Sequence, residues 1–203
     1  MRSRRFVRAT PRPTDALIES FLGWVGGTGW SIRLLESLYM WNWVESVHVL
    51  SIALFVGTAI MMDLRLVGLA FKGVPASEFT GRMLPWTRVG FFISVATGLV
   101  IFYSNPLRYW HNVFFRVKLV MLVLAGLNVW FFHSRIHKRV SEWDVEPVPP
   151  RAAKVAGVVS ILAWAMVVVT GRMIAYNWFD CDLQPQPDWV NWLASCALET
   201  GAN

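Results

Sequence analysis

Apolar residues in this chain come in four long runs separated by short polar segments. The runs cover about residues 42–62, 83–103, 113–133 and 155–175. A helix needs about 20 apolar residues to cross the roughly 30 Å of hydrocarbon in a bilayer, and each run reaches that length. Within the runs the apolar residues follow neither the period of an amphipathic helix nor the alternation of a strand. The pattern therefore predicts an all-α integral membrane protein, a four-helix bundle formed by residues 41–175.

Two flanking regions differ from the spans. Residues 1–40 begin with a basic arm that holds five arginines in its first twelve positions. Ala16–Trp30 follows, interrupted by four glycines, and we interpret it as an interfacial amphipathic helix and turn, too short to cross the bilayer. Residues 176–203 form a polar, proline-containing tail that we expect outside the membrane. The tail holds both cysteines, Cys181 and Cys196, and their spacing leaves both a disulfide and two free thiols open.

Composition supports the membrane assignment. Of the 203 residues, 55% are hydrophobic and 16% are charged, whereas a soluble domain carries about a quarter charged residues. The net charge of +6 comes from lysines and arginines beside the apolar runs. Such residues set the topology and contact anionic lipid headgroups, so we expect the lipid bilayer as a partner and no nucleic acid.

The distribution of positive charge predicts the orientation. The loops after the first and third spans together hold nine lysines and arginines, whereas the tail after the fourth holds none and has four acidic residues. By the positive-inside rule both loops face the cytoplasm, which predicts a multi-pass protein of a bacterial inner membrane with both termini in the periplasm. The arginine-rich arm opposes this orientation, but it lies farther from a span than the two loops do.

Ionisable residues inside membrane spans are costly, so they mark candidate sites. The first span contains Glu45 and His48, which share a helix face because they are three residues apart. The third span contains Lys118, the fourth contains Arg172, and His111 precedes the third. At 1.5 Å per residue, His48, Lys118 and Arg172 lie roughly 9, 8 and 10 Å from the bilayer centre, all toward the external surface. The sequence thus predicts one polar layer.

This layer has the residue types of a haem site. An imidazole in an apolar bundle can hold the iron of a b-type haem, with His48 as the axial ligand. Lys118, in its neutral form, and His111 are alternative second ligands. Arg172 would pair with a haem propionate, and Glu45 would tune the haem or move protons. Two other interpretations stay open: a structural network in which Glu45 pairs with Arg172 or Lys118, and a site for a metal or another small ligand.

A second polar group lies at the predicted cytoplasmic end. Asp63 and Arg65 end the first span, where we interpret them as snorkelling side chains. His133 and His137 have a spacing that metals accept, but the basic residues around them favour a helix end beside anionic lipid. Asn128 is expected to form a hydrogen bond between helices. Four glycines are expected at close helix contacts: Gly57, Gly98, Gly126 and Gly157. The middles of the spans are apolar, which argues against a polar path between the two groups.

Three sequence marks carry a resemblance to known families. They are E-x-x-H in the first span, D-L-R-L-x-G at its end and K-L-x(8)-N in the third span. Over about residues 30–175 the chain resembles a family of uncharacterised bacterial four-helix membrane proteins. More distantly, it is similar to the HemJ-type protoporphyrinogen oxidase and to the membrane domain of CopD copper proteins. The HemJ likeness implies that His48 and Lys118 bind haem or take part in catalysis, and the CopD likeness implies copper handling.

Together these observations predict a membrane redox protein. It would bind b-type haem, alone or as an accessory subunit of a larger membrane redox complex, with quinone or another membrane subunit as its electron partner. The alternatives are a HemJ-like porphyrinogen oxidase, a non-catalytic structural or assembly subunit, and a copper or small-solute transport protein. The oxidase would need a porphyrin-sized cleft around His48, and the transporter would need a polar path between the two polar groups.

Overall fold

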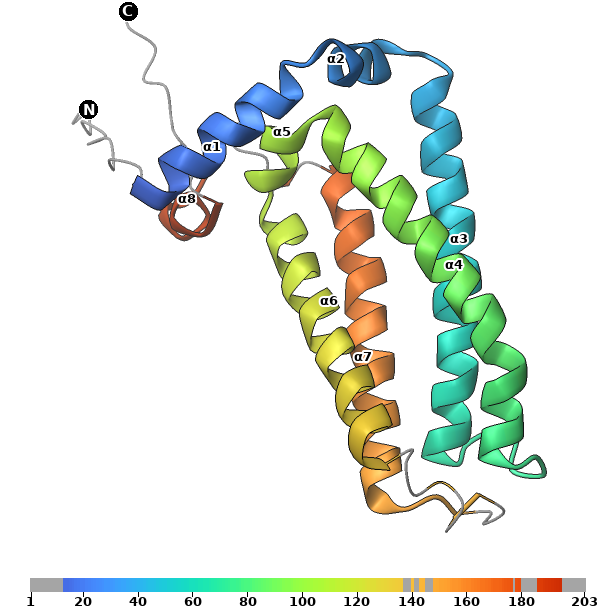
Figure 1. Cartoon of the computed structure of the whole chain (residues 1–203). Helices are drawn as coiled ribbons and strands as arrows, with labels where there is room; N and C mark the ends of the chain where they lie inside the picture. The colour runs from blue at the N-terminus through green and yellow to red at the C-terminus, as the bar shows by residue number, and fades with distance from the viewer. Residues whose placement is uncertain are drawn as a thin grey trace, which may run out of the picture. The chain divides into compact units, whose positions relative to one another are not determined.

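The computed structural model describes residues 13–136, 140, 143–144, 148–176, 178–179 and 186–194, and these ranges are mostly helical and contain no strand. Four helices are long and apolar enough to cross a membrane (Figure 1). They are α3 (Met40–Val67), α4 (Ala76–Ser104), α6 (Val113–Phe131, continued by a π segment at Phe132–Ile136) and α7 (Arg151–Met173). The predicted all-α, four-span architecture is confirmed. Three helices begin before the predicted spans. The first turns of α4 and α7 carry polar residues, among them Glu78 and Arg151, that a search for apolar runs leaves out.

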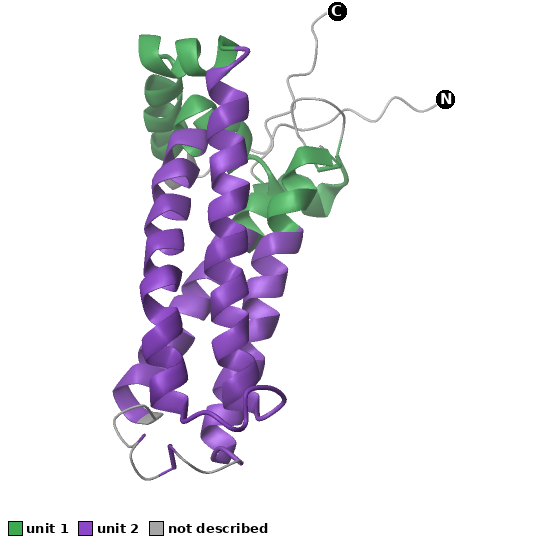
Figure 2. Ribbon diagram, turned by 90° about the vertical axis from the view of Figure 1, so that its right-hand side faces the viewer, with its two compact units in different colours: residues 1–37, 102–117, 170–203 green, residues 38–101, 118–169 purple. Residues whose placement is uncertain are grey.

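The chain divides into two compact units (Figure 2). The span unit, residues 38–101 and 118–169, holds α3 and most of α4, α6 and α7. The end unit, residues 1–37, 102–117 and 170–203, holds the short helices. These are α1 (Pro13–Gly26), α2 (Gly29–Glu36), α5 (Pro106–Trp110) and α8 (Asp188–Ala194).

In the span unit, α3 and α4 run antiparallel and meet along a seam of mostly polar and small side chains (Figure 1). The paired positions, α3 first, are His48 with Thr97, Ser51 with Ser94, Phe55 with Gly90, and Thr58 with Thr87. Each step of three or four residues along α3 is matched by the same step back along α4, which is the spacing of a coiled-coil seam. The Ser94 hydroxyl donates to the Ser51 hydroxyl at 2.9 Å. The Thr87 hydroxyl donates in the same way to Thr58 at 2.8 Å, so hydroxyl pairs hold the register.

Gly90 makes the closest contact in this seam. A Cβ atom there would lie 2.8 Å from a backbone nitrogen of α3, so only glycine lets the two backbones approach this closely. Gly98 and Gly157 also face atoms of neighbouring helices, as predicted. Nothing lies within 4 Å of a Cβ atom built on Gly57 or Gly126, which contradicts the prediction for these two. All five glycines lie in helices that cross the apolar region, so the sequence alone does not separate them.

Aromatic contacts join the α3–α4 seam to the other spans. The ring of Phe55 packs edge-on against Trp164 of α7, with centroids 4.6 Å apart, and against Phe91 of α4 at 5.3 Å. Buried alanines fill the space between α3, α6 and α7. The amide nitrogen of Asn128 on α6 donates to the carbonyl of Ala156 on α7 at 3.0 Å, which confirms the predicted interhelical hydrogen bond.

The D-L-R-L-x-G segment ends α3. Gly68 adopts a left-handed conformation (φ 81°), and its N–H donates to the carbonyl of Leu64. Arg65 is 1% exposed; its Nε donates to the carbonyl of Val74 at 2.9 Å and its Nη2 to the carbonyl of Asp144 at 3.4 Å. Arg65 thus fastens two loops to the helix end. The prediction that Arg65 snorkels is wrong, because the side chain is buried and its Nε and Nη2 donate to loop carbonyls instead of water.

Asp144 caps the first turn of α4. Its carboxylate accepts hydrogen bonds from the Ser77 N–H at 2.7 Å and from the Ser77 hydroxyl at 2.5 Å. Partial burial raises the pKa of Asp144, but hydrogen bonds from Ser77 and Ala76 and the charge of Arg65 outweigh it, so the pKa lies below its usual value. The carboxylate also faces the positive end of the α4 dipole.

The end unit ties the N-terminal helices to the last turn of α4. The Thr28 oxygen accepts from the N–H of Ser31 at 3.4 Å and so caps α2. Ser31 is buried, and its hydroxyl donates to the carbonyls of Tyr103 at 2.9 Å and Ser104 at 3.1 Å. The prediction of a helical segment too short to span is confirmed by α1, which has 14 residues.

Part of the predicted polar tail is folded. In α8, Val190 and Ala194 are buried against Val113 of α6. Arg116 donates from Nη1 to the carbonyl of Leu193 at 2.5 Å and from Nη2 to that of Ala194 at 3.1 Å, which satisfies the last carbonyls of α8. The five arginines of the arm, together with Cys181 and Cys196, lie outside the described residues.

Replacing Gly90 by alanine tests the seam. We expect Gly90→Ala to lower the free energy of unfolding by about 1–3 kcal/mol, because the new methyl group meets backbone atoms that cannot move aside. Gly57→Ala is the matched control: its methyl group enters open space, so it should be neutral or stabilising by up to about 1 kcal/mol. Unfolding by detergent titration measures both. Equal effects of the two substitutions would contradict the close packing at Gly90.

Replacing Asp144 by asparagine tests the α4 cap through pH. The lowered pKa means that the ionised carboxylate stabilises the fold above its unfolded pKa of about 3.8, and that this contribution disappears as the pH falls through the native pKa. We expect Asp144→Asn to lower the melting temperature at pH 7 and to lose its effect in strong acid. Glu78→Gln is the control. Glu78 lies in the first turn of α4 and forms an exposed ion pair with Arg82, so this substitution should change the melting temperature little at either pH.

Candidate functional site

His48 is held on the α3–α4 seam by Thr97. The distance between His48 Nδ1 and Thr97 Oγ1 is 2.8 Å. The Thr97 hydroxyl donates to the carbonyl of Ile93 at 2.7 Å, so its oxygen is the acceptor toward His48. This contact places the imidazole proton on Nδ1 and leaves the lone pair on Nε2.

Gly98 makes room for this ring. A Cβ atom on Gly98 would lie 3.2 Å from His48 Cε1, tighter than an ordinary contact. The imidazole is therefore fixed in position by a hydrogen bond at one edge and by a glycine beside it. Its local geometry is that of an oriented ligand or hydrogen-bond acceptor, with Nε2 as the reactive atom.

Lys118 projects from α6 and belongs to the same unit as His48. Among the described residues it has neither a hydrogen bond nor an ion pair. Of the five predicted site residues, Glu45, His48 and Lys118 belong to the span unit.

Glu45, His111 and Arg172 are placed differently. Glu45 lies one turn before His48 on α3 and is exposed. His111 and Arg172 belong to the end unit. There the Nε2 atom of His111 lies 3.3 Å from a carboxylate oxygen of Glu19. The exposed guanidinium of Arg172 lies 5.2 Å from the centroid of the Tyr176 ring. A single layer that contains all five residues stays a prediction.

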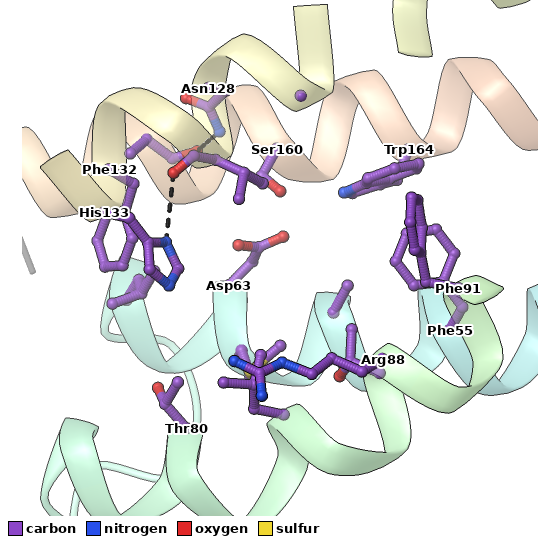
Figure 3. A pocket seen from close by; sticks show the side chains of 18 of the residues that line it. Phe55, Asp63, Thr80, Arg88, Phe91, Asn128, Phe132, His133, Ser160 and Trp164 are labelled. Carbon is purple, nitrogen blue, oxygen red and sulfur yellow. Dashed lines mark hydrogen bonds between the residues drawn. The ribbon is translucent and has the colours of Figure 1, made fainter. Parts of the chain in front are cut away.

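The second polar group is more buried than the sequence suggested. Asp63 is 7% exposed and its carboxyl points into a cavity between the spans, so the prediction that it snorkels is wrong (Figure 3). His133 lines the same cavity, with its Nδ1 atom 3.3 Å from the carbonyl of Val129. His137 lies outside the described residues. In the described part of the chain, no three His, Cys, Asp or Glu side chains gather as a metal site.

Sequence reasoning missed the partners of His48 and the hydroxyl pairs below it. Ser51 and Thr58 on α3 are seven residues apart, as are Ser94 and Thr87 on α4. That shared spacing was the available signal, but single hydroxyl residues hardly change the hydropathy of an apolar run. The interpretation of the span middles as wholly apolar is therefore wrong at this seam, although Phe55 interrupts the hydroxyl series.

The fold and the site define a multi-pass helical membrane protein with buried polar groups on its first span. Residues 16–177 match a family of unknown function (DUF6644), and the chain belongs to that family. No curated protein and no solved structure matches the chain. The distant resemblances to HemJ and CopD proteins stay predictions.

A double-mutant cycle tests the hydrogen bond between His48 and Thr97. We expect Thr97→Val and His48→Leu to show a coupling free energy of about 1 kcal/mol, because either change alone leaves a partially buried polar group without its partner. The unfolding free energies of the two single variants, the double variant and the wild type give this quantity. Thr80→Val combined with His48→Leu is the control pair and should be additive. A coupling near zero for the first pair would contradict the contact.

Proposed function

We propose that this protein is a membrane-embedded redox protein that holds a b-type haem through His48. The observation that carries the proposal is the hydrogen bond at Nδ1, which orients the ring and leaves the Nε2 lone pair as a ligand. A histidine that binds metal through one nitrogen commonly donates its other N–H to a protein acceptor, and Thr97 provides that acceptor. A bound haem would supply one-electron transfer.

The residue types fit a haem better than a bare metal ion. A bare zinc or copper ion needs three or four protein ligands, and the described residues provide no cluster of that size. A haem iron already has four porphyrin nitrogens and needs one or two more ligands. His48 would supply the first. Lys118, which lacks a partner among the described residues, would supply the second in its neutral form. His111 is the alternative, and it would have to leave its contact with Glu19.

In this proposal Arg172 and Glu45 act at the edge of the haem and do not bind its iron. The exposed Arg172 guanidinium is the cation for a haem propionate, since that group stays close to the membrane surface. Glu45 is exposed one turn from His48 and would exchange protons with water. By the positive-inside rule, the loop charges favour the periplasmic side of a bacterial inner membrane for this end of the protein, with both termini outside.

The electron partner in this proposal is quinone or another membrane subunit. A HemJ-like porphyrinogen oxidase would be its enzymatic form and would use the same His48 and Lys118. A non-catalytic assembly subunit is the second candidate, and one observation favours it. The hydrogen bond between His48 and Thr97 also joins two helices, so the imidazole would stabilise the fold without any cofactor.

A reduced-minus-oxidised absorption spectrum of the protein, purified in mild detergent from haem-replete cells, separates these candidates. We expect a b-type α-band that is lost in His48→Ala and kept in the control His133→Ala, because His133 lies in the other polar group. Lys118→Ala should shift the spectrum if the amine is the second ligand, and His111→Ala should do so if the imidazole is. A colourless wild type, or a band that survives in His48→Ala, would overturn the haem proposal.

A further inference from the structure

A cavity of about 590 Å³ lies in the span unit among α3, α4, α6 and α7. This volume is within the range of small-molecule sites. Most of its wall is apolar, and several aromatic rings contribute to it. Figure 3 shows Phe55, Phe91 and Trp164 gathered on one side of Asp63, with His133 on the other. The site is distinct from the His48 group, because neither His48 nor Lys118 lines it.

Asp63 gives the cavity its unusual feature. Figure 3 shows the Ser160 side chain of α7 facing this carboxyl. The second oxygen, Oδ2, is buried and has no partner among the described residues. A buried acceptor without a donor is unfavourable in an apolar site, so a ligand that donates a hydrogen bond would stabilise it.

The two ionisable groups of opposite sign at the cavity wall disfavour a ligand with a net charge of either sign. Arg88 of α4 lines the cavity together with Asp63. A lipophilic cation would meet the guanidinium, and a ligand carboxylate would meet the Asp63 carboxylate. Thr80 and Thr87 add hydroxyl groups that both donate and accept. The set therefore suits a neutral ligand that carries hydrogen-bond donors and acceptors on an aromatic ring.

The cavity opens toward the apolar surface of the spans. On α4 its rim includes Phe92, which is 68% exposed, and Val95. On α6 the rim includes Leu122 and Val129, which are also exposed. In a membrane this surface contacts acyl chains, so a ligand would enter from the bilayer and leave an apolar tail between α4 and α6.

We propose that this cavity binds a quinol, a hydroxylated aromatic ring with an apolar tail, whose hydroxyl donates to Asp63 Oδ2. The ring would pack among Phe55, Phe91 and Trp164, with Arg88 near the oxygen at its other side. Only the choice of a quinol as the ligand rests on the proposed redox function, in which quinone is an electron partner. The proposed quinol site includes Asp63 of α3, whereas His48 belongs to the other polar group of the same helix.

Binding of decylubiquinol to haem-free protein in lipid nanodiscs tests the proposal, measured by isothermal titration calorimetry. We expect saturable binding that Asp63→Asn weakens about tenfold, since the substitution keeps the shape, puts an amide NH2 in place of one oxygen and leaves only an uncharged, weaker acceptor. The dimethyl ether of the same quinol lacks the donor, so it should bind the wild type and Asp63→Asn with similar, weak affinity. This ligand control gives an answer even if the variant folds poorly.

Substitutions at two glycines give a variant that fills the cavity and a matched control. Gly126 lines the cavity and has open space around it, so Gly126→Leu should fill the site and abolish binding. Gly57 has the same open surroundings on α3 but does not line the cavity, and Gly57→Leu should bind like the wild type. Absence of binding, equal binding to Gly126→Leu, or equal affinity for quinol and ether would overturn the proposal. Because the protein is haem-free, none of these outcomes depends on the haem proposal.

Discussion

In the hydrocarbon core a hydroxyl group has no water to bind, so the serine and threonine side chains of α3 and α4 must pair with each other or with the backbone. The pairs Ser51–Ser94 and Thr58–Thr87, with Gly90 between them, allow one register of the two helices. A shift of one helix by a single residue would break both pairs and press a larger residue against the α3 backbone. The same register sets Thr97 beside His48 at one end and Arg88 near Asp63 at the other.

One helix, α3, carries the key residue of each polar group. His48 and Asp63 are fifteen positions apart on it, about 22 Å along the axis. The end of α3 is held by Arg65, which donates to a carbonyl of the loop between α3 and α4 and to a carbonyl of the loop between α6 and α7. Asp144 in the second loop caps α4, so the helix that pairs with α3 is fixed by the same contacts. The cavity around Asp63 is thus built on rigid elements, which is the requirement for a defined binding site.

The number, class and approximate limits of the spans could be predicted from the sequence, because an uninterrupted apolar run of membrane length rarely forms anything but a transmembrane helix. Asn128 could also be predicted, since a mid-span amide almost needs an interhelical partner. The burial of Asp63 and Arg65 could not, because the loop carbonyls and the Ser160 hydroxyl that surround them come from distant parts of the chain. The same holds for Gly90, whose importance depends on the register of two helices rather than on its neighbours in sequence.

The central claim of this account is that His48 is a neutral imidazole with its proton on Nδ1 and a lone pair on Nε2, oriented as a ligand. Nitrogen NMR of ¹⁵N-histidine-labelled, haem-free protein in lipid bilayers tests it most directly. The chain has four histidines, and the spectrum of His48→Gln would assign the His48 signals by their absence. The account predicts a protonated nitrogen at Nδ1 and an unprotonated one at Nε2. A proton on Nε2 would contradict it, because the lone pair that is proposed to bind haem iron would not exist.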